Sequence, residues 1–415
     1  MMPVLSVLSR MEATSKDGSV SERCAHAAAL KRASAVRHFA RMETNISENF
    51  SITIRSTWAT CRAARAFLQA RLCYDARVPR VQRPPGIDFA AARFAESLDA
   101  AWRRRAPIVE DGEVTAYRVL DGPGDGAPGV YLDRYGPAAV MNVYEDAHLS
   151  QTSVTTAAQL TLDVLAPAGL EAVYVKPFAR DRSRLGGRSP EELRAAAPRV
   201  GRKQPESLVV QEYESRFEVR LYDGHSTGLF LDHREHRRAL SQRRPPRVLN
   251  LFAYTCAFAV ALAGVGARVT NVDVSARYLE WGRRNLALNG LEPSAARFFR
   301  MDAFEFLAYA ARHRDERFDL VILDPPTFAA GDRRRGMKPW KALDDYPELV
   351  QAAVRVLAPG GSVFAASNTR ELAGNGALAW LITKALGSAP AWQPLPPWPV
   401  DVRESGRVAA VLFTP

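Results

Sequence analysis

The sequence lacks a long apolar run and has few cysteines. No uninterrupted apolar stretch reaches the roughly 18 residues that a membrane span requires, so no membrane association is expected. The 415 residues include four cysteines, and none of them forms a Cys-x-x-Cys pair. This pattern argues against a zinc site or a disulfide framework, and it suits a reducing compartment. We therefore expect a cytoplasmic protein that holds no metal.

Lysine is scarce as well, because it supplies only 7 of the 56 basic residues. Arginine binds phosphate well, but a GC-rich genome produces the same bias, and the sequence does not decide between the two interpretations. The net charge of +11 is uneven: residues 1–85 carry 14 basic and 6 acidic side chains, and residues 86–415 carry 42 and 39. The larger part is only mildly basic, so net charge alone does not establish RNA binding.

Composition divides the chain into three segments. Residues 1–86 show no sustained period and end in Arg-Pro-Pro-Gly. We expect a disordered extension there, with a targeting peptide or a small folded domain as alternatives. Residues 87–204 combine a helical period at 87–106 with short strands around a dense turn at 121–129. This pattern predicts a small α+β domain that ends in a basic linker.

Strands and helices alternate in the third segment, residues 205–415. Strands are expected at 247–252, 268–272, 296–300, 320–323, 362–366 and 408–413, and helices at 256–263, 276–288, 303–312 and 345–357. This alternation predicts a doubly wound, Rossmann-like α/β fold, with a parallel sheet between two layers of helices. Ligands of such sheets bind at the carboxyl ends of the strands, so residues directly after the strands are candidates for the site.

The first two strand ends carry groups that suit a nucleotide cofactor. Thr255 is placed to cap the helix after the first strand, whose N-terminus would hold an anion, although the loop 250–256 contains no glycine. Asp273 follows the second strand, 23 residues after Asn250. This spacing is near the ~20 residues expected for a carboxylate on ribose hydroxyls. The alternative for Asp273 is a helix N-cap, and the ribose role is favoured.

Acidic residues also follow the third and fourth strands. Asp302 is placed either to accept a hydrogen bond from an adenine amino group or to cap the next helix. Asp324 begins the motif Asp-Pro-Pro-Thr-Phe after the fourth strand. The two prolines hold the chain extended, so that Asp324 can face a pocket, and Phe328 is placed to stack on a flat ring.

These motifs resemble the large-subunit ribosomal RNA methyltransferases, which use S-adenosylmethionine (SAM). The segments that resemble the K-type guanine-N7 enzyme are 227–234, 250–256, 278–281, 285–291 and 324–328. Residues 117–136 instead resemble the central domain of the I-type cytosine-C5 enzyme. The resemblance covers about residues 88–415. It implies a class I SAM-dependent enzyme that acts on large-subunit ribosomal RNA or on the assembling subunit.

The resemblance and the strand ends together give the candidate site residues. The cofactor-binding candidates are Phe252, Tyr254, Thr255, Asp273, Asp302, Ala303 and Asp324. The catalytic candidates are Asp324, Pro325, Pro326, Phe328 and Asn368.

Basic residues near the predicted pocket are candidates for contact with RNA, because they lie in a loop that also carries Trp340. These residues are Arg333, Arg334, Arg335, Lys338 and Lys341. A second basic cluster is Arg237, Arg238, Arg243, Arg244 and Arg247, for which a solvated face is the alternative. Asp232 and Arg234 either cap the pocket or form a structural salt bridge.

Two departures from the I-type pattern bear on the chemistry. Residues 1–85 contain no recognisable PUA domain, with which I-type enzymes begin. Those enzymes also carry a nucleophilic cysteine after the fifth strand, where this sequence has Ser367 and Asn368. Cytosine carbon 5 reacts only after a thiolate adds to the ring, whereas guanine N7 keeps a lone pair and needs only positioning. Cys256 replaces a family glycine and is expected to be a packing residue.

The sequence therefore predicts methylation of guanine N7, or of another ring nitrogen, in large-subunit ribosomal RNA. Two alternatives stay open: a cytosine-C5 methyltransferase with an unrecognised nucleophile, and a SAM- and RNA-binding assembly factor without catalysis. The modified nucleotide and the oligomeric state are not determined by the sequence.

Overall fold

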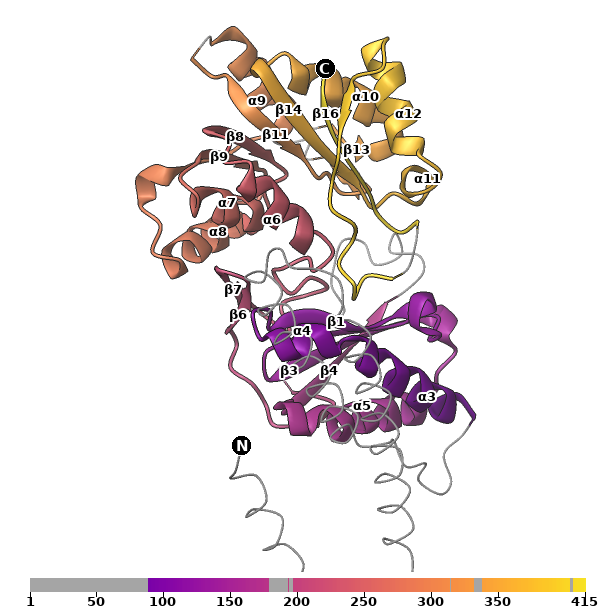
Figure 1. Ribbon diagram of the computed structural model, residues 1–415. Helices are drawn as coiled ribbons and strands as arrows, with labels where there is room; N and C mark the ends of the chain where they lie inside the picture. The colour runs from indigo at the N-terminus through magenta and orange to yellow at the C-terminus, as the bar shows by residue number, and fades with distance from the viewer. Residues whose placement is uncertain (1–88, 179–192, 194–196, 314, 332–337, 404–405) are drawn as a thin grey trace, which may run out of the picture. The chain divides into compact units, whose positions relative to one another are not determined.

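The computed structural model describes residues 89–178, 193, 197–313, 315–331, 338–403 and 406–415. They all belong to one compact unit, Ala76–Pro415. The expected N-terminal extension and most of the basic linker lie outside the described residues. Two main sheets, of five and seven strands, carry the described part of the fold (Figure 1). In that part, no helix is both long enough and apolar enough to cross a membrane.

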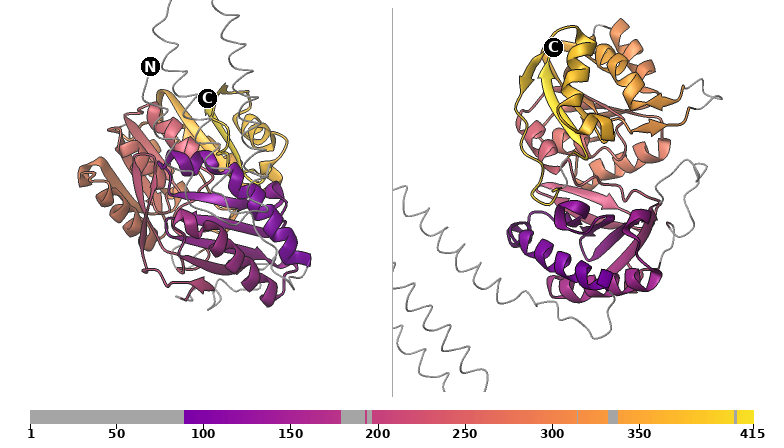
Figure 2. Two further views of the ribbon diagram at one scale, coloured as in Figure 1. Left: turned by 60° about the horizontal axis from the view of Figure 1, so that its bottom comes forward. Right: turned by 90° about the vertical axis from the view of Figure 1, so that its right-hand side faces the viewer.

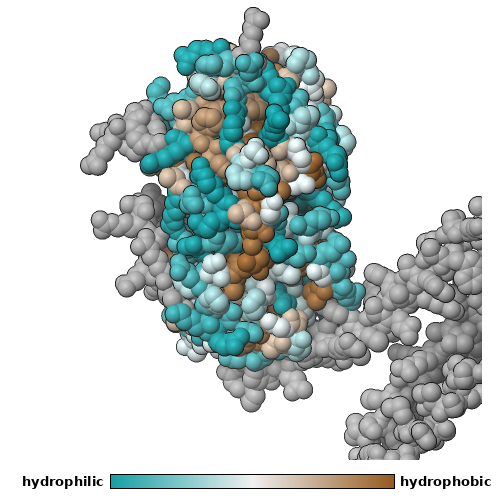
Figure 3. All heavy atoms as spheres, turned by 90° about the vertical axis from the view of Figure 1, so that its left-hand side faces the viewer, coloured by the Kyte–Doolittle hydropathy of each residue, from teal (hydrophilic) through white to brown (hydrophobic). Residues whose placement is uncertain are grey.

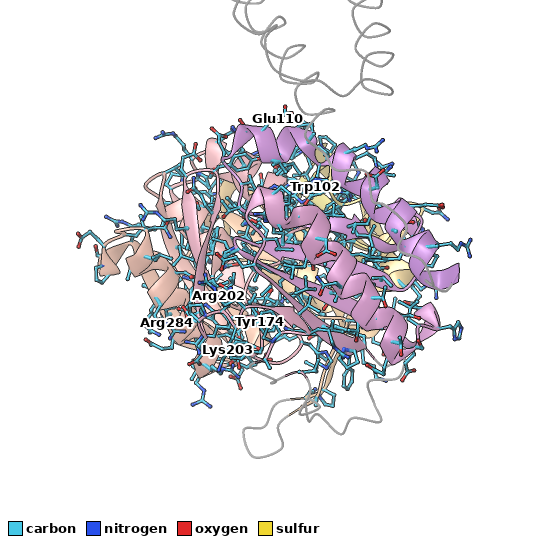
Figure 4. The ribbon with its side chains drawn as sticks, turned by 90° about the horizontal axis from the view of Figure 1, so that it is seen from below. Trp102, Glu110, Tyr174, Arg202, Lys203 and Arg284 are labelled. Carbon is cyan, nitrogen blue, oxygen red and sulfur yellow. The ribbon has the colours of Figure 1, made fainter. Side chains whose placement is uncertain are left out.

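The five-stranded sheet comes first in the chain. Its strands, in spatial order, are β1 (Ala116–Asp121), β2 (Val130–Tyr135), β3 (Ala138–Tyr144), β4 (Ala172–Phe178) and β5 (Val200–Gly201). Only β3 and β4 pair in parallel. The helices α3 (Phe89–Arg104), which carries Trp102, and α5 (Gln151–Leu165) lie side by side on one face of this sheet (Figure 4). A short helix, α4 (Ala106–Asp111), follows α3.

A two-stranded hairpin that the sequence did not predict follows the first sheet. It consists of β6 (Leu208–Glu212) and β7 (Ser215–Val219). The indole of Trp281 donates a hydrogen bond to the carbonyl of Glu218, and Asn285 accepts one from the Glu218 amide. The hairpin is therefore anchored by side chains of helix α8 (Ala276–Leu288), more than 60 residues away in the sequence, which no local pattern reveals.

The seven-stranded sheet confirms the predicted doubly wound α/β fold. Its strands, in spatial order, are β10 (Ala296–Arg300), β9 (Arg268–Asp273), β8 (Arg247–Leu251), β11 (Phe318–Leu323), β14 (Leu357–Ser367), β16 (Ala409–Thr414) and β15 (Ala391–Gln393). The first five are parallel, and the last two pair antiparallel. Along the sheet, the sequence order of the strands changes direction between β8 and β11, and such a point is where parallel sheets bind ligands.

Alternating side chains of this sheet enter two separate cores, as the strand pleat requires. Leu320 and Ile322 of β11 belong to one core with α7 (Ala257–Ala263) and α8, and Val321 and Leu323 belong to the other. The second core contains residues of α9 (Ala303–Arg312), α10 (Ala342–Val354) and α12 (Ala377–Leu386). Helices therefore cover both faces (Figure 2). With these side chains inside, the face in Figure 3 is mostly hydrophilic, with a narrow hydrophobic strip.

The remaining elements differ from the sequence prediction mainly at their ends. Helix α10 begins at Ala342 rather than 345, because the Asp345 carboxylate accepts a hydrogen bond from the amide of Lys341 (2.6 Å) and so secures an earlier start. Besides the hairpin of β6 and β7, the elements that were not predicted include α4, β5, α6 (Arg234–Gln242), α11 (Arg370–Ala373), α12, β15, and the small hairpin of β12 (Phe328–Ala329) and β13 (Trp340–Lys341).

Candidate active site

A cavity of about 410 Å³ opens at the carboxyl ends of the four strands β8, β9, β10 and β11. Its walls are mainly the residues that directly follow these strands, as expected for a ligand site at the switch point of a parallel sheet. All seven predicted cofactor candidates line it: Phe252, Tyr254, Thr255, Asp273, Asp302, Ala303 and Asp324. The acidic side chains from three strand ends therefore meet at one cavity.

The loop after β8 has a backbone conformation that glycine normally supplies. Phe252, Tyr254 and Cys256 have φ angles of 54°, 49° and 62°. The left-handed region costs about 1–2 kcal/mol for each residue that has a Cβ. The loop keeps this shape although it contains no glycine, and the surrounding contacts must offset the strain.

The predicted helix cap at Thr255 is wrong. The N-cap of α7 is Cys256, which makes no side-chain capping bond. The hydroxyl of Thr255 is fully buried and donates to the carbonyl of Gly228 (2.6 Å), while Asn285 donates to the Thr255 carbonyl (2.9 Å). Gly228 has φ 103°, and a side chain there would collide with the indole of Trp281. Thr255 thus ties the loop to a segment 27 residues upstream.

Asp273 holds two backbone segments of the cavity wall together. Its Oδ2 accepts from the amide of Tyr254 (2.9 Å), and its Oδ1 accepts from the amide of Ser275 (2.8 Å). The N-cap of α8 is Ser275, not Asp273. Burial raises the pKa of Asp273, and the two amide donors oppose that rise. A carboxylate oxygen accepts more than one hydrogen bond, so Asp273 can also receive ribose hydroxyls.

Asp302 caps a helix and lines the cavity at once. Its Oδ1 accepts from the amides of Phe304 (2.8 Å) and Glu305 (3.4 Å) at the start of α9. The capping interpretation is therefore correct. Both bonds use Oδ1, so the second carboxylate oxygen takes no part in the cap.

Asp324 faces a buried histidine that the sequence analysis did not select. Its Oδ2 lies 3.8 Å from Nε2 of His233, and both residues line the cavity. Burial raises the pKa of Asp324, and His233 opposes the rise. The other ring nitrogen of His233, Nδ1, lies 3.0 Å from Nδ1 of His236. Burial, reinforced by His233, lowers the pKa of His236 to about 3, so His236 is neutral near pH 7.

The segment after Asp324 is fixed by two hydrogen bonds. The indole of Trp340 donates to the carbonyl of Pro326 (2.6 Å), and the hydroxyl of Thr327 donates to Oδ1 of Asn368 (2.8 Å). Pro325, Pro326 and Asn368 all line the cavity. Phe328 does not; its side chain is 58% exposed. The structure therefore does not bring the predicted stacking residue to the cavity.

Of the predicted RNA-binding loop, Lys338 lines the cavity. Lys341 is exposed and does not line it; its Nζ lies 3.9 Å from Asp344. Arg333, Arg334 and Arg335 lie outside the described residues. The cavity therefore has one basic side chain from this loop on its wall among the described residues.

The second basic cluster is largely engaged within the protein. Arg237 is buried and pairs with Glu212 (2.7 Å), and Arg247 pairs with the carboxylate of Asp319 (3.4 Å). The guanidinium of Arg238 lies over the ring of Tyr213. Arg234 pairs with Asp401 (2.5 Å), which supports the structural salt bridge, whereas Asp232 lines the cavity.

Aromatic residues outside the candidate site residues also line the cavity, among them Phe230 and Tyr278, together with Trp340 of the predicted RNA-binding loop. The ring of Tyr254 lies 5.3 Å from Phe230 and 4.5 Å from Tyr278. Phe230 and His233 fall within the segment 227–234, whose family resemblance was the one signal that could have found them.

Known proteins that are similar to this chain are methyltransferases. Residues 195–391 match the family model described as S-adenosylmethionine-dependent methyltransferase. The chain is 34% identical to ribosomal RNA large subunit methyltransferase I of Klebsiella pneumoniae (strain 342), over 69% of this chain and 68% of the relative. It is 35% identical to the ribosomal RNA large subunit methyltransferase of Deinococcus radiodurans, over 70% of this chain and 69% of the relative.

A solved structure shows the same fold. The crystal structure of SMU.776 complexed with SAH aligns with a TM-score of 0.66 and 24% identity, over 80% of this chain and 83% of that chain. At this identity the likeness concerns the fold alone.

Proposed function

Because the chain belongs to the family of SAM-dependent methyltransferases of large-subunit ribosomal RNA, we propose that its target is a ring nitrogen, guanine N7. The cofactor is SAM. The finer assignment depends on one observation, the position of Cys256.

Cys256 is placed as a packing residue. It is fully buried, it does not line the cavity, and its sulfur packs against Gly282 of α8. Burial raises the pKa of its thiol well above the ordinary range, so the thiolate is scarce at neutral pH. Among the residues that the structure describes, Cys256 is the only cysteine. The described cavity therefore offers no thiolate for addition to cytosine.

Methylation of N7 requires no such nucleophile. SAM, when bound, would supply a methyl group from a sulfonium sulfur. N7 would form the new bond with its lone pair, the carbon–sulfur electron pair would stay with sulfur, and the positive charge would pass to the purine. No proton leaves the base, whereas methylation of cytosine carbon 5 must remove the proton there. The protein's task is then positioning and charge stabilisation.

The cavity residues suit these two tasks. The carboxylate of Asp324 stabilises the positive charge that develops on the base. The side-chain oxygen of Asn368 accepts a hydrogen bond from the hydroxyl of Thr327. The amide N–H groups of Asn368 therefore point away from Thr327. Guanine O6 lies beside N7 and is an acceptor, so the Asn368 amide is suited to donate to it. Asp273 and Asp302 are proposed to hold the ribose and the adenine of SAM.

The deciding experiment is mass spectrometry of labelled nucleosides after the purified full-length protein has methylated large-subunit ribosomal RNA with isotopically labelled SAM. The expected product is labelled 7-methylguanosine, and the same nucleoside should disappear from ribosomal RNA of cells that lack the gene. C256S and C256G should still transfer methyl groups. Labelled 5-methylcytidine that vanishes in C256S would instead identify the cytosine-C5 enzyme.

The cytosine-C5 enzyme is retained as the second candidate because residues 117–136 resemble its central domain. If the protein bound SAM but transferred no methyl group to any RNA, the result would favour the third alternative, an assembly factor without catalysis. The three-domain division, with boundaries near 86 and 204, is proposed from composition and from the pattern of expected helices and strands.

A further inference from the structure

Asp232 has a buried oxygen that no described residue satisfies. Its Oδ1 is inaccessible to solvent and has no hydrogen-bond partner in the described part of the chain, and the residue lines the cavity. An unsatisfied buried acceptor destabilises the folded protein, and more so when it is charged. Because solvent does not reach Oδ1, the carboxylate must turn toward the cavity before a ligand can bring the missing donor.

The surroundings of Asp232 supply charge without supplying that donor. Burial alone would raise its pKa, but His233, Arg118, Arg237 and Arg407 outweigh burial and lower the pKa below its ordinary value. The guanidinium of Arg118 is hydrogen-bonded to Asp133 and Asp121, and that of Arg237 to Glu212. Asp232 is therefore an ionised carboxylate, which accepts hydrogen bonds and donates none.

Asp232 lies close enough to Asp324 to raise the pKa of that carboxyl, and Asp324 is the residue proposed to stabilise the charge on the methylated base. Asp232 immediately precedes His233, whose ring approaches Asp324. The proposed contacts of ribose and adenine lie at the ends of other strands: Asp273 is the last residue of β9, and Asp302 follows β10. A donor that meets Asp232 is thus expected to belong to the acceptor of the methyl group.

Phe230 stands beside Asp232 along the same segment. Leu229 and Leu231 are buried in the core, whereas Phe230 is 50% exposed and lines the cavity with Asp232. Successive side chains of this segment thus alternate between the core and the cavity, and Phe230 and Asp232 are on the cavity side. A half-exposed ring at a cavity wall offers a stacking surface to a nucleobase.

We propose that Asp232 identifies the target base as guanine by accepting hydrogen bonds from N1–H and the 2-amino group, while Phe230 stacks on the ring. Guanine is the base whose Watson–Crick edge offers two adjacent donors. Adenine and cytosine place an acceptor beside their amino group, which a carboxylate repels, and uracil offers one N–H between two carbonyls. This inference rests on the proposed function and extends it to the choice of base.

The proposal also agrees with the atom that is methylated. N1 and the 2-amino group lie across the purine from N7, so a base held by that edge presents N7 to the opposite wall. An enzyme that methylated N1 or N2 would need the same edge to be free. Recognition by Asp232 and transfer to N7 are therefore geometrically compatible.

The test compares D232N with the wild-type full-length protein on ribosomal RNA whose target guanosine has been mapped. The amide presents N–H groups where guanine needs an acceptor, so kcat/KM for RNA should fall by about 10- to 100-fold, as for other bidentate base contacts. The dissociation constant for SAM should change by less than about twofold. E235Q neutralises a neighbouring carboxylate that does not line the cavity, and it should transfer normally.

A substrate with inosine at the mapped position provides a second readout. Inosine lacks the 2-amino group, so the wild type should methylate it about 10-fold more slowly than guanosine, while D232N should show no such difference. Equal discrimination by both proteins would overturn the inference. So would a D232N variant that loses SAM affinity but keeps its KM for RNA, because Asp232 would then hold the cofactor's ammonium group. Absence of 7-methylguanosine with the wild type would instead refute the proposed function.

Discussion

The imidazole Nε2 of His233 lies 3.8 Å from Oδ2 of Asp324, at the end of the central strand β11. The pair joins the segment before α6 to the Asp-Pro-Pro motif, so the two walls of the cavity meet through one electrostatic contact. Since burial raises the pKa of Asp324 and His233 opposes the rise, the histidine helps keep the carboxylate ionised.

D324N should therefore abolish most of the catalysis. The amide has nearly the same size but no charge, so the positive charge that develops on the base is no longer stabilised, and kcat should fall by about 100-fold or more. Single-turnover methyl transfer and SAM binding measured side by side separate chemistry from cofactor affinity. D319N, on the same strand but outside the cavity, is the control. A D324N variant with the wild-type kcat would remove Asp324 from the mechanism.

D273A should weaken SAM binding. The substitution removes the proposed ribose contact and the acceptor for the amides of Tyr254 and Ser275, so the dissociation constant should rise by about 10-fold or more. D273N keeps one carbonyl oxygen and should bind SAM with intermediate affinity. Calorimetric titration with SAM measures both variants. Unchanged affinity in D273A would show that Asp273 is only a structural residue.

G282A should destabilise the fold, and C256G should rescue it. A Cβ at position 282 would lie 2.9 Å from the Cβ of Cys256, and closer still to its sulfur. Overpacking of this kind costs about 1–3 kcal/mol in the free energy of unfolding. Glycine at 256 opens the space and tolerates the φ of 62°, so the double variant should recover most of the loss.

Chemical denaturation of the wild type, G282A and C256G/G282A measures this coupling. G374A is the matched control, because a Cβ at Gly374 meets no atom within 4 Å. If G282A were as stable as G374A, the close contact between α8 and the cofactor loop would not exist.

His236 should make the protein lose stability in acid. Its pKa is lowered from 6.5 to about 3, first by burial and then by His233 and Arg237, against Asp232 and the Pro396 carbonyl. Between these pH values the unfolded chain binds a proton that the folded protein does not. The contribution of neutral His236 to the free energy of unfolding is therefore fully present above pH 6.5. It declines as the pH falls, by about 1.4 kcal/mol per pH unit.

H236Q should reduce that dependence. Free energies of unfolding measured from pH 6.5 to 4.5 should fall less steeply in the variant than in the wild type, although carboxylates contribute to both slopes. Because glutamine does not titrate, only the difference between the two slopes reports on His236. Parallel slopes would mean that His236 takes up its proton in the folded protein as readily as in the unfolded chain.

K338A should weaken RNA binding more than K341A. Both lysines flank Trp340, but only Lys338 lines the cavity. Loss of one phosphate contact should reduce the slope of log K against log salt by about 0.7 to 0.9, and K341A should leave the slope closer to the wild-type value. Filter binding of ribosomal RNA fragments over a salt series measures both variants. Equal slopes for K338A and the wild type would exclude a phosphate contact at Lys338.

The sequence alone determined the doubly wound fold and the strand ends at which the acidic residues lie. Alternating hydrophobic periods and breakers are local signals, and they predicted the elements from residue 247 to residue 323 to within two residues at their ends. Because strands of a parallel sheet end at one edge, that order by itself predicted that Asp273, Asp302 and Asp324 would meet.

Only the tertiary structure decided what each side chain contacts. Thr255 bonds to Gly228 rather than to its own helix, Arg234 bonds to Asp401 across 167 residues, and Phe328 stays outside the cavity that Phe230 lines. The partners in these contacts are remote in the sequence, so no local pattern encodes them. The orientation of Cys256 toward Gly282 likewise arises from the packing of α8 against the loop, a relation that exists only once the chain has folded.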